Sequence, residues 1–287
     1  MTVTAAMVKE LREKTGAGFM DSKKALEQCD GDMEKAMEFL RQKGIASAEK
    51  KQDRIAAEGL VATYIENGVG AIVEINCETD FVAKNEDFKT FVNNVAKHIA
   101  QTKPSDLDAL NASVCPVCNM TIADLVKDKT ATIGEKISIR RFEVLEGELA
   151  TYVHNGKIGV LISASAQDEA LLKDVALHIA SSAPEFVSRK EIPQSVIDEE
   201  TRIEMGKEDL AKKPENIRAK IVEGRVNKLM AQKCLLEQPF VKNPDQTVEQ
   251  LLSGKLEIKK FVRWTLGEGL EKRQDNFAEE VMNQMVK

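Results

Sequence analysis

An internal repeat constrains the fold of this chain more than any other feature of its sequence. Residues 60–75 read LVATYIENGVGAIVEI, and residues 149–162 read LATYVHNGKIGVLI. In both segments an Asn-Gly pair separates two apolar runs that contain β-branched residues. Asn and Gly both accept positive φ, so the pair favours a type I′ turn between antiparallel strands. Each copy therefore predicts a β-hairpin.

The two copies also share a helix that follows the hairpin. Residues 95–100 read VAKHIA, and residues 175–180 read VALHIA. A hairpin that packs against a following helix is an α+β unit. The sequence therefore predicts an α+β fold whose core contains two repeated β-hairpin-plus-helix subdomains.

The first copy is longer than the second between the hairpin and the helix. It has 28 positions from Gly70 to His98, whereas the second copy has 19 from Gly159 to His178, a difference of 9 residues. The extra residues lie around 77–85, which read CETDFVAKN. Because the second copy forms the same unit without them, these residues are predicted to form a loop that carries function.

Phe81 is the residue of this loop that has two contrasting interpretations. Glu78 and Asp80 precede it, and Lys84 follows closely. In one interpretation the aromatic ring folds back and caps the core. In the other it inserts into another protein, as an aromatic anchor of the kind that dominates many interfaces. For an arbitrary sequence the first interpretation is preferred, and the residues alone leave the second open.

Residues 1–54 are predicted to form a bundle of three short helices and a charged linker. Gly16 and Gly18 stop the first helix, since glycine accepts the left-handed conformation that ends helices. Asp21 is a candidate N-cap of the second helix. Apolar residues at helical spacing mark the third helix, and Gly44 is expected to close the bundle.

A second helical region follows the repeats. Val196, Ile203 and Leu210 recur at sevenfold spacing among many charges, and Pro214 suits the first turn of a further helix. These residues predict a protruding antiparallel helical hairpin that packs on a partner or on a second copy of the chain. Asp275 is a candidate cap of a last helix.

These elements divide the chain into six predicted parts. They are a helical domain with its linker at 1–54, a core N-subdomain at 55–140, a core C-subdomain at 141–186, the hairpin arm at 187–228, a return to the C-subdomain at 229–263, and a C-terminal module at 264–287.

Composition and charge exclude several classes of function. The net charge is −6, whereas a nucleic-acid-binding surface needs a basic face. No apolar run is long enough to cross a bilayer, and residues 1–10 do not resemble a secretory signal. Five cysteines, an odd number in a long chain, favour a reducing compartment. We therefore expect a cytoplasmic protein without direct contact to nucleic acid or membrane.

No motif for catalysis or cofactor binding is apparent. The Gly-Lys pairs are followed by Ile, Glu and Leu, so none forms a phosphate-binding loop. His98 and His178 occupy the same position in the two copies, which favours a structural role, and His154 lies in a hairpin turn. Cys115 and Cys118 form a CxxC pair that is redox-active, half of a zinc site or without function. We expect no catalytic residue, no metal and no cofactor.

The chain resembles the family of bacterial translation elongation factor Ts over essentially its whole length. The resemblance is specific because many segments occur in the family's order. They are VKELR at 8–12, TGAG at 15–18, MD at 20–21, NCETDFVAK at 76–84, RR at 140–141, His154 with IGVL at 158–161, EGR at 223–225 and QPFV at 238–241. The CxxC pair is not part of the resemblance.

The resemblance implies a guanine-nucleotide exchange factor for elongation factor Tu, bound in its GDP-bound and nucleotide-free forms. It implies that Phe81, together with Thr79, Asp80 and Val82, enters the partner near the magnesium and phosphate site, so that GDP leaves. Further implied contacts are Arg12, Met20, His154 and Gly159. The N-terminal bundle would be similar to ubiquitin-associated domains, and the arm would support a homodimer in some members.

Two alternatives belong to other classes of protein. A pure adaptor would bind a partner through the N-terminal bundle without changing nucleotide release. An α+β enzyme would use His154 and the CxxC pair, and it would turn over substrate without a partner protein. The missing phosphate loop and catalytic triad count against the enzyme.

Overall fold

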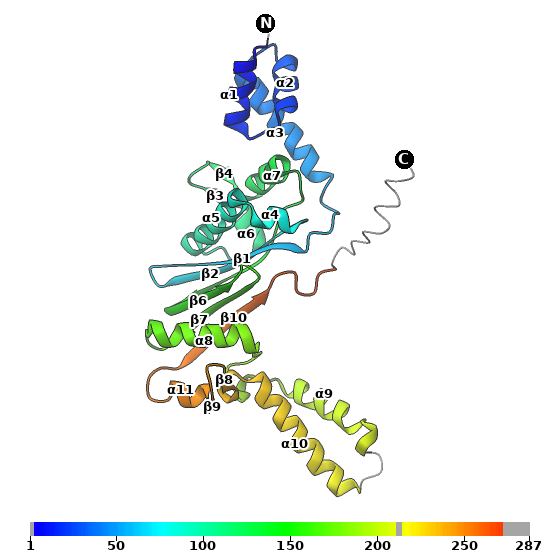
Figure 1. Ribbon diagram of the computed structural model, residues 1–287, viewed down its shortest axis with the longest axis vertical. Coiled ribbons are helices and arrows are strands. Elements are labelled where there is room, and N and C mark those ends of the chain that lie inside the picture. Colours follow the sequence, from blue (N-terminus) through cyan, green and yellow to red (C-terminus); the bar gives the residue numbers. More distant parts are fainter. Residues whose placement is uncertain (1–2, 211–213, 272–287) are drawn as a thin grey trace. The chain divides into compact units, whose positions relative to one another are not determined.

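A computed structural model describes residues 3–210 and 214–271 (Figure 1). Helices and small sheets, with antiparallel hairpin pairing, alternate along the chain, which confirms the α+β class. Contacts divide the chain into two compact units. One contains Met1–Ala62, Val73–Phe142 and Thr265–Lys287, and the other contains Thr63–Ile72 and Glu143–Trp264. The six parts inferred from the sequence stay a prediction, and the helix predicted after Asp275 lies outside the described residues.

Three helices form the N-terminal bundle, α1 (Ala5–Thr15), α2 (Phe19–Gln28) and α3 (Met33–Glu49). Their facing apolar side chains make one buried cluster, composed of Val8, Leu11, Ala25, Leu26 and Ala36. Gly16 ends α1 at a φ of 68°, and its N–H donates to the carbonyl of Arg12, so the predicted helix stop is confirmed.

Two details of the bundle differ from the prediction. The N-cap of α2 is Gly18, not Asp21, which lies in the first turn and pairs with Lys43 at 2.7 Å. Gly44 does not close the bundle, because α3 continues through it to Glu49. A Cβ at Gly44 would lie 2.9 Å from the Cβ of Ala131 in α7 (Ile122–Ile133), so this glycine permits close packing of two helices.

Both predicted hairpins are present. Asn67 and Gly68 have φ values of 51° and 72°, and Asn155 and Gly156 have 52° and 69°. Positive φ at both central residues is the signature of the type I′ turn, which confirms the interpretation of the two Asn-Gly pairs. The hairpins are β1 (Glu58–Glu66) with β2 (Val69–Cys77) and β6 (Glu148–His154) with β7 (Ile158–Ala164).

Each hairpin gains a third strand that comes from elsewhere in the sequence. β5 (Ser138–Glu146) adds to β2, and β10 (Ile258–Thr265) adds to β7. The sheets therefore have the orders β1-β2-β5 and β10-β7-β6. Gly267 and Gly269, directly after β10, have positive φ.

The repeated helices are α5 (Glu86–Thr102) and α8 (Glu169–Ser182), and each carries a buried histidine. His98 Nε2 lies 2.7 Å from Ser113 Oγ. His178 Nδ1 accepts from the N–H of Val241 at 3.1 Å, so its Nε2 donates to Gln238 at 2.8 Å. Burial lowers the pKa of both imidazoles. Both are neutral core groups, as their equivalent positions predict.

Short helices and strands connect the hairpins and long helices along the chain. They are α4 (Asp80–Lys84), α6 (Leu107–Ala112), β3 (Val114–Cys115), β4 (Met120–Thr121), β8 (Pro239–Phe240), β9 (Asn243–Thr247) and α11 (Val248–Leu252), with 3-10 turns at Arg189–Glu191, Glu208–Leu210 and Leu235–Glu237. Across residues 3–210 and 214–271, no helix has both the length and the apolar character that crossing a bilayer requires.

The predicted arm is a pair of neighbouring helices, α9 (Gln194–Met205) and α10 (Glu215–Lys233) (Figure 1). Pro214 precedes α10 directly. Leu210 is buried in the apolar cluster of the arm. Ile203, however, is 48% exposed, so the predicted stripe of sevenfold spacing is buried only in part.

Candidate partner-binding site

The nine-residue insert folds into the short helix α4. Thr79 is its N-cap, and its Oγ1 accepts from the N–H of Val82 at 3.4 Å. Asn85 ends α4 and caps α5, where its Oδ1 accepts from the N–H of Asp87 at 2.8 Å. Asp80 lies in the first turn, where the helix dipole favours an acidic side chain. The insert is thus a capped helical turn between β2 and α5.

The base of the insert is held by the carboxylate of Glu135. Its Oε2 accepts from the N–H groups of Glu78 at 3.2 Å and Thr79 at 3.0 Å, and its Oε1 accepts from Thr79 Oγ1 at 2.6 Å. Glu78 in turn accepts from the N–H of Lys136 at 2.6 Å and pairs with Arg54 at 3.2 Å. Hydrogen bonds to charged groups are among the stronger ones in proteins. The insert therefore starts from a fixed base.

Phe81 projects from this base and is 79% exposed. Lys84 lies near its ring, with Nζ 5.9 Å from the ring centroid, and the same Nζ is 2.6 Å from Asp80 Oδ2. Ala83 is buried and anchors the other side of the short helix. The interpretation of Phe81 as a cap of the core is therefore wrong, and the aromatic ring is available to another molecule.

Removal of the brace at Glu135 is expected to loosen the insert. Glu135→Ala leaves three donors without their carboxylate, and we expect a loss of about 1–2 kcal/mol in the free energy of unfolding. Urea denaturation measures this loss, and amide exchange at Thr79 should accelerate. Glu86→Ala is the matched control, because the Glu86 side chain is 84% exposed and forms an ion pair with Lys89. Equal effects of the two variants would contradict the assigned brace.

The other predicted contact residues are spread over both units. Arg12 and Met20 are exposed in the first unit, and His154 is exposed in the second, whereas Gly159 is buried opposite Val153. Sequence analysis did not identify Phe19, which is 49% exposed beside Met20 at 57%. Two large apolar residues directly after the glycine stop were a signal that could have identified this surface.

The cysteines have contrasting environments. Burial, assisted by the charge of Glu135, raises the pKa of the Cys77 thiol to about 12. Its S–H donates to the carbonyl of Thr79 at 3.1 Å, so Cys77 supports the insert as a neutral thiol. Burial opposes a low pKa at Cys115, but N–H groups of Cys118 and Val117 and the Cys118 thiol lower it.

The side chain of His154 interacts with residues of its own hairpin. His154 is exposed, and its ring nitrogens lie 3.1 Å from Tyr152 Oη and 3.3 Å from Asn155 Nδ2. Within the part of the chain that the structure describes, no three His, Cys, Asp or Glu side chains gather in a way that could hold a metal.

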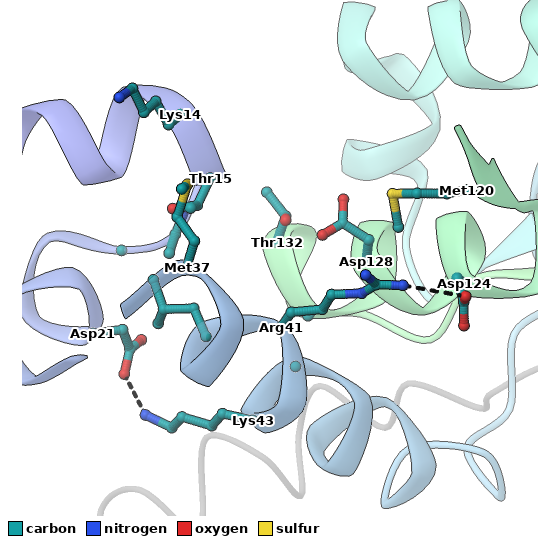
Figure 2. A pocket seen from close by; sticks show the side chains of 15 residues that line it. Lys14, Thr15, Asp21, Met37, Arg41, Lys43, Met120, Asp124, Asp128 and Thr132 are labelled. Carbon is teal, nitrogen blue, oxygen red and sulfur yellow. Dashed lines mark hydrogen bonds and ion pairs between the residues drawn. The ribbon is translucent and has the colours of Figure 1, made fainter. Parts of the chain in front are cut away.

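A pocket of about 460 Å³ lies in the first unit, between the N-terminal helices and α7 (Figure 2). Its charged lining is balanced, with Lys14, Arg41 and Lys43 against Asp21, Asp124 and Asp128. The ion pairs Arg41–Asp124 at 3.3 Å and Lys43–Asp21 at 2.7 Å occupy four of these groups. Burial raises the pKa of Asp128. Such a lining selects no particular ligand charge, so the pocket is not the candidate site.

An exposed aromatic residue on a braced helical turn is the kind of group that anchors contacts between proteins. The family model for Elongation factor TS matches residues 78–268, which is two thirds of the chain and includes α4. The chain therefore belongs to the elongation factor Ts family. Members of this family are nucleotide-exchange factors for elongation factor Tu in translation elongation.

Proposed function

We propose that this protein promotes GDP release from elongation factor Tu by inserting α4 into the partner near its magnesium and phosphate site. The observation that carries this proposal is the exposure of Phe81, 79%, in the first turn of a helix whose N-cap Thr79 is hydrogen-bonded to Glu135. A ring that enters a neighbouring protein displaces side chains there. Magnesium coordination is then disturbed, and the affinity for GDP falls.

The thermodynamics of exchange require no catalytic group on this chain. An exchange factor binds the nucleotide-free partner more tightly than the GDP-bound partner. The coupling is reciprocal: bound factor lowers the affinity for GDP, and bound GDP lowers the affinity for the factor by the same ratio. The factor must supply a rigid binding segment. The capped helix α4 and its hydrogen bonds to Glu135 provide this rigidity, and a preorganised segment loses little conformational freedom on binding.

The residues next to Phe81 have distinct proposed roles. Thr79 joins the brace to the helix, because its hydroxyl donates to Glu135 and accepts from Val82. The half-buried Val82 extends the apolar surface behind the ring. Asp80 holds Lys84 beside the ring, where the ammonium limits the directions that Phe81 can take.

Contacts outside the insert belong to the same proposal. The N-terminal bundle resembles a ubiquitin-associated domain and docks on the nucleotide-binding domain of the partner. Arg12 and Met20 lie on the face of the bundle that makes this contact. His154 adds a contact from the hairpin of the second unit. Gly159 is buried, so its proposed part is to support the strand opposite the exposed Val153.

The remaining parts of the proposal concern location and assembly. The protein acts in the cytoplasm on GDP-bound and nucleotide-free elongation factor Tu, with no direct contact to nucleic acid or membrane. The module at 264–287 contacts the nucleotide-binding domain. Exposed Ile203, Met205 and Ile217 on the arm suit a homodimer. Sedimentation at high protein concentration in the presence of chelator measures the mass of the assembly. The mass of one chain would exclude that homodimer.

Release of a fluorescent GDP analogue from elongation factor Tu tests the function. We expect catalytic amounts of this protein to accelerate release when unlabelled nucleotide is in excess. An adaptor would bind the partner, as measured by calorimetry, and leave the release rate unchanged. Turnover of a substrate without the partner would favour an enzyme instead.

A further inference from the structure

The CxxC pair lies in a small hairpin between α6 and α7 (Figure 1). Cys115 is in β3 and pairs with Met120 of β4. Asn119, with φ of 52°, closes the turn, and its N–H donates to the carbonyl of Cys115 at 2.9 Å. Cys118 lies within this turn, three positions after Cys115.

The spacing of the two cysteines is that of a metal-binding pair. Pro116 and Val117 separate Cys115 from Cys118, and the backbone hydrogen bond from Asn119 to Cys115 encloses all four residues in one tight turn. Cysteine pairs with this spacing supply two of the four ligands in typical structural zinc sites. Two cysteines on such a turn are suited to a thiophilic cation such as Zn²⁺.

The turn supplies only half of a zinc site. Structural Zn²⁺ takes four ligands in a tetrahedron. No third His, Cys, Asp or Glu side chain joins the pair among residues 3–210 and 214–271. The remaining residues, 1–2, 211–213 and 272–287, contain neither cysteine nor histidine, and their acidic residues are Asp275, Glu279 and Glu280. Any further thiolate or imidazole ligand must therefore come from another molecule.

The surface around the turn suits a second copy of the same turn. Cys118 is exposed, Val117 is 93% exposed and Val114 is 52% exposed. Residues 113–122 contain no charged side chain, although the whole chain has a net charge of −6. Two such turns can approach without charge repulsion from their side chains, and the contact would cover the exposed valines.

We propose that two copies of this chain bind one Zn²⁺ between their turns, with Cys115 and Cys118 of each copy as the four ligands. The thiols lose their protons to solvent when the metal binds, so binding strengthens as pH rises. The assembly uses no residue of the insert, and it depends on metal, which a homodimer through the arm would not.

Zinc titration of the full-length reduced chain, prepared with a chelator, tests the proposal. We expect binding to saturate at one zinc ion per two chains, measured by metal analysis of the isolated complex. The mass measured by sedimentation should be twice that of the metal-free chain when zinc is bound. It should fall back to the mass of one chain when chelator is added. Co²⁺ in place of Zn²⁺ should give the absorption spectrum of a tetrahedral tetrathiolate site.

Variants separate the turn from the other thiols. Cys115→Ser and Cys118→Ser should each abolish the zinc-dependent doubling, whereas Cys29→Ser, at a half-buried thiol in the N-terminal bundle, should retain it. One zinc ion per single chain, no zinc binding, or a dimer that reductant alone dissociates would each overturn the proposal. Nucleotide release is measured on the metal-free chain, so these outcomes leave the test of exchange unaffected.

Discussion

Phe81→Ala is expected to slow GDP release from elongation factor Tu about 30-fold at a given concentration of this protein. Truncation of an aromatic anchor at the centre of an interface commonly costs about 2 kcal/mol, and each 1.4 kcal/mol is a factor of ten. The ring is 79% exposed in the free chain, so the loss falls on the contact with the partner and not on folding. Stopped-flow fluorescence of labelled GDP measures the rate.

Binding itself should change less than the rate in this variant. The proposed contacts from the N-terminal bundle and the second unit are unchanged in this variant, so calorimetry with nucleotide-free elongation factor Tu should show a smaller loss. Phe81→Leu should give an intermediate rate, because it keeps apolar volume but not the aromatic ring. Ile203→Ala is the control, since Ile203 is 48% exposed on the arm. An unchanged release rate for Phe81→Ala would refute the role given to the insert.

Glu74→Ala is expected to lower the free energy of unfolding by about 3 kcal/mol, the lower end of the range for breaking a buried ion pair. The Glu74 side chain is fully buried, and it accepts from Arg140 at 2.9 Å, Arg141 at 2.7 Å and the N–H of Gly267 at 2.8 Å. This one carboxylate joins β2, β5 and the residues after β10. Both arginines are partly solvated, which is why we expect the lower end.

Urea denaturation measures this loss, and Glu268→Ala provides its control. The Glu268 carboxylate also pairs with Arg141, at 3.5 Å, but its side chain is 56% exposed. An exposed pair contributes about 0–1 kcal/mol, so this variant should unfold at nearly the same urea concentration as the parent. Equal losses in the two variants would show that burial of Glu74 does not explain its contribution to the free energy of unfolding.

The contribution of Glu74 should depend on pH. Burial alone would raise the pKa of this carboxyl, but the Gly267 N–H, Arg140 and Arg141 outweigh burial and hold that pKa below its ordinary value of 4.5. A group whose pKa is lower in the folded state stabilises the protein above its unfolded pKa. The stability difference between the parent and Glu74→Gln should therefore be full above about pH 4.5 and shrink as pH falls further.

The sequence predicted those features that local patterns encode. The two Asn-Gly turns, the helix stop at Gly16 and the site of the insert follow from residue types at short range. Comparison of the two repeats also located Phe81, since the insert has no counterpart in the second copy. Whether its ring faced the core or solvent could not be predicted, because that depends on Glu135, which lies 56 positions after Thr79.

The features that sequence analysis missed depend on partners far apart along the chain. Gly44 has the pattern of a helix stop, but its lack of a side chain serves the contact with Ala131. Glu74 stands in an apolar run like an outward-facing strand residue, yet Gly267, 193 positions away, helps to bury it. The predicted cap at Asp21 failed similarly, since this carboxylate pairs with Lys43 of another helix.

The joint between hairpin and helix has a consequence for how such a protein can diverge. The two copies build the same unit with joints that differ by 9 residues. The longer joint can therefore change in length or composition without disturbing the packing of the scaffold. After duplication, one copy can remain purely structural while the other acquires a projecting binding segment. The same joint is a suitable place to graft a recognition segment from another protein.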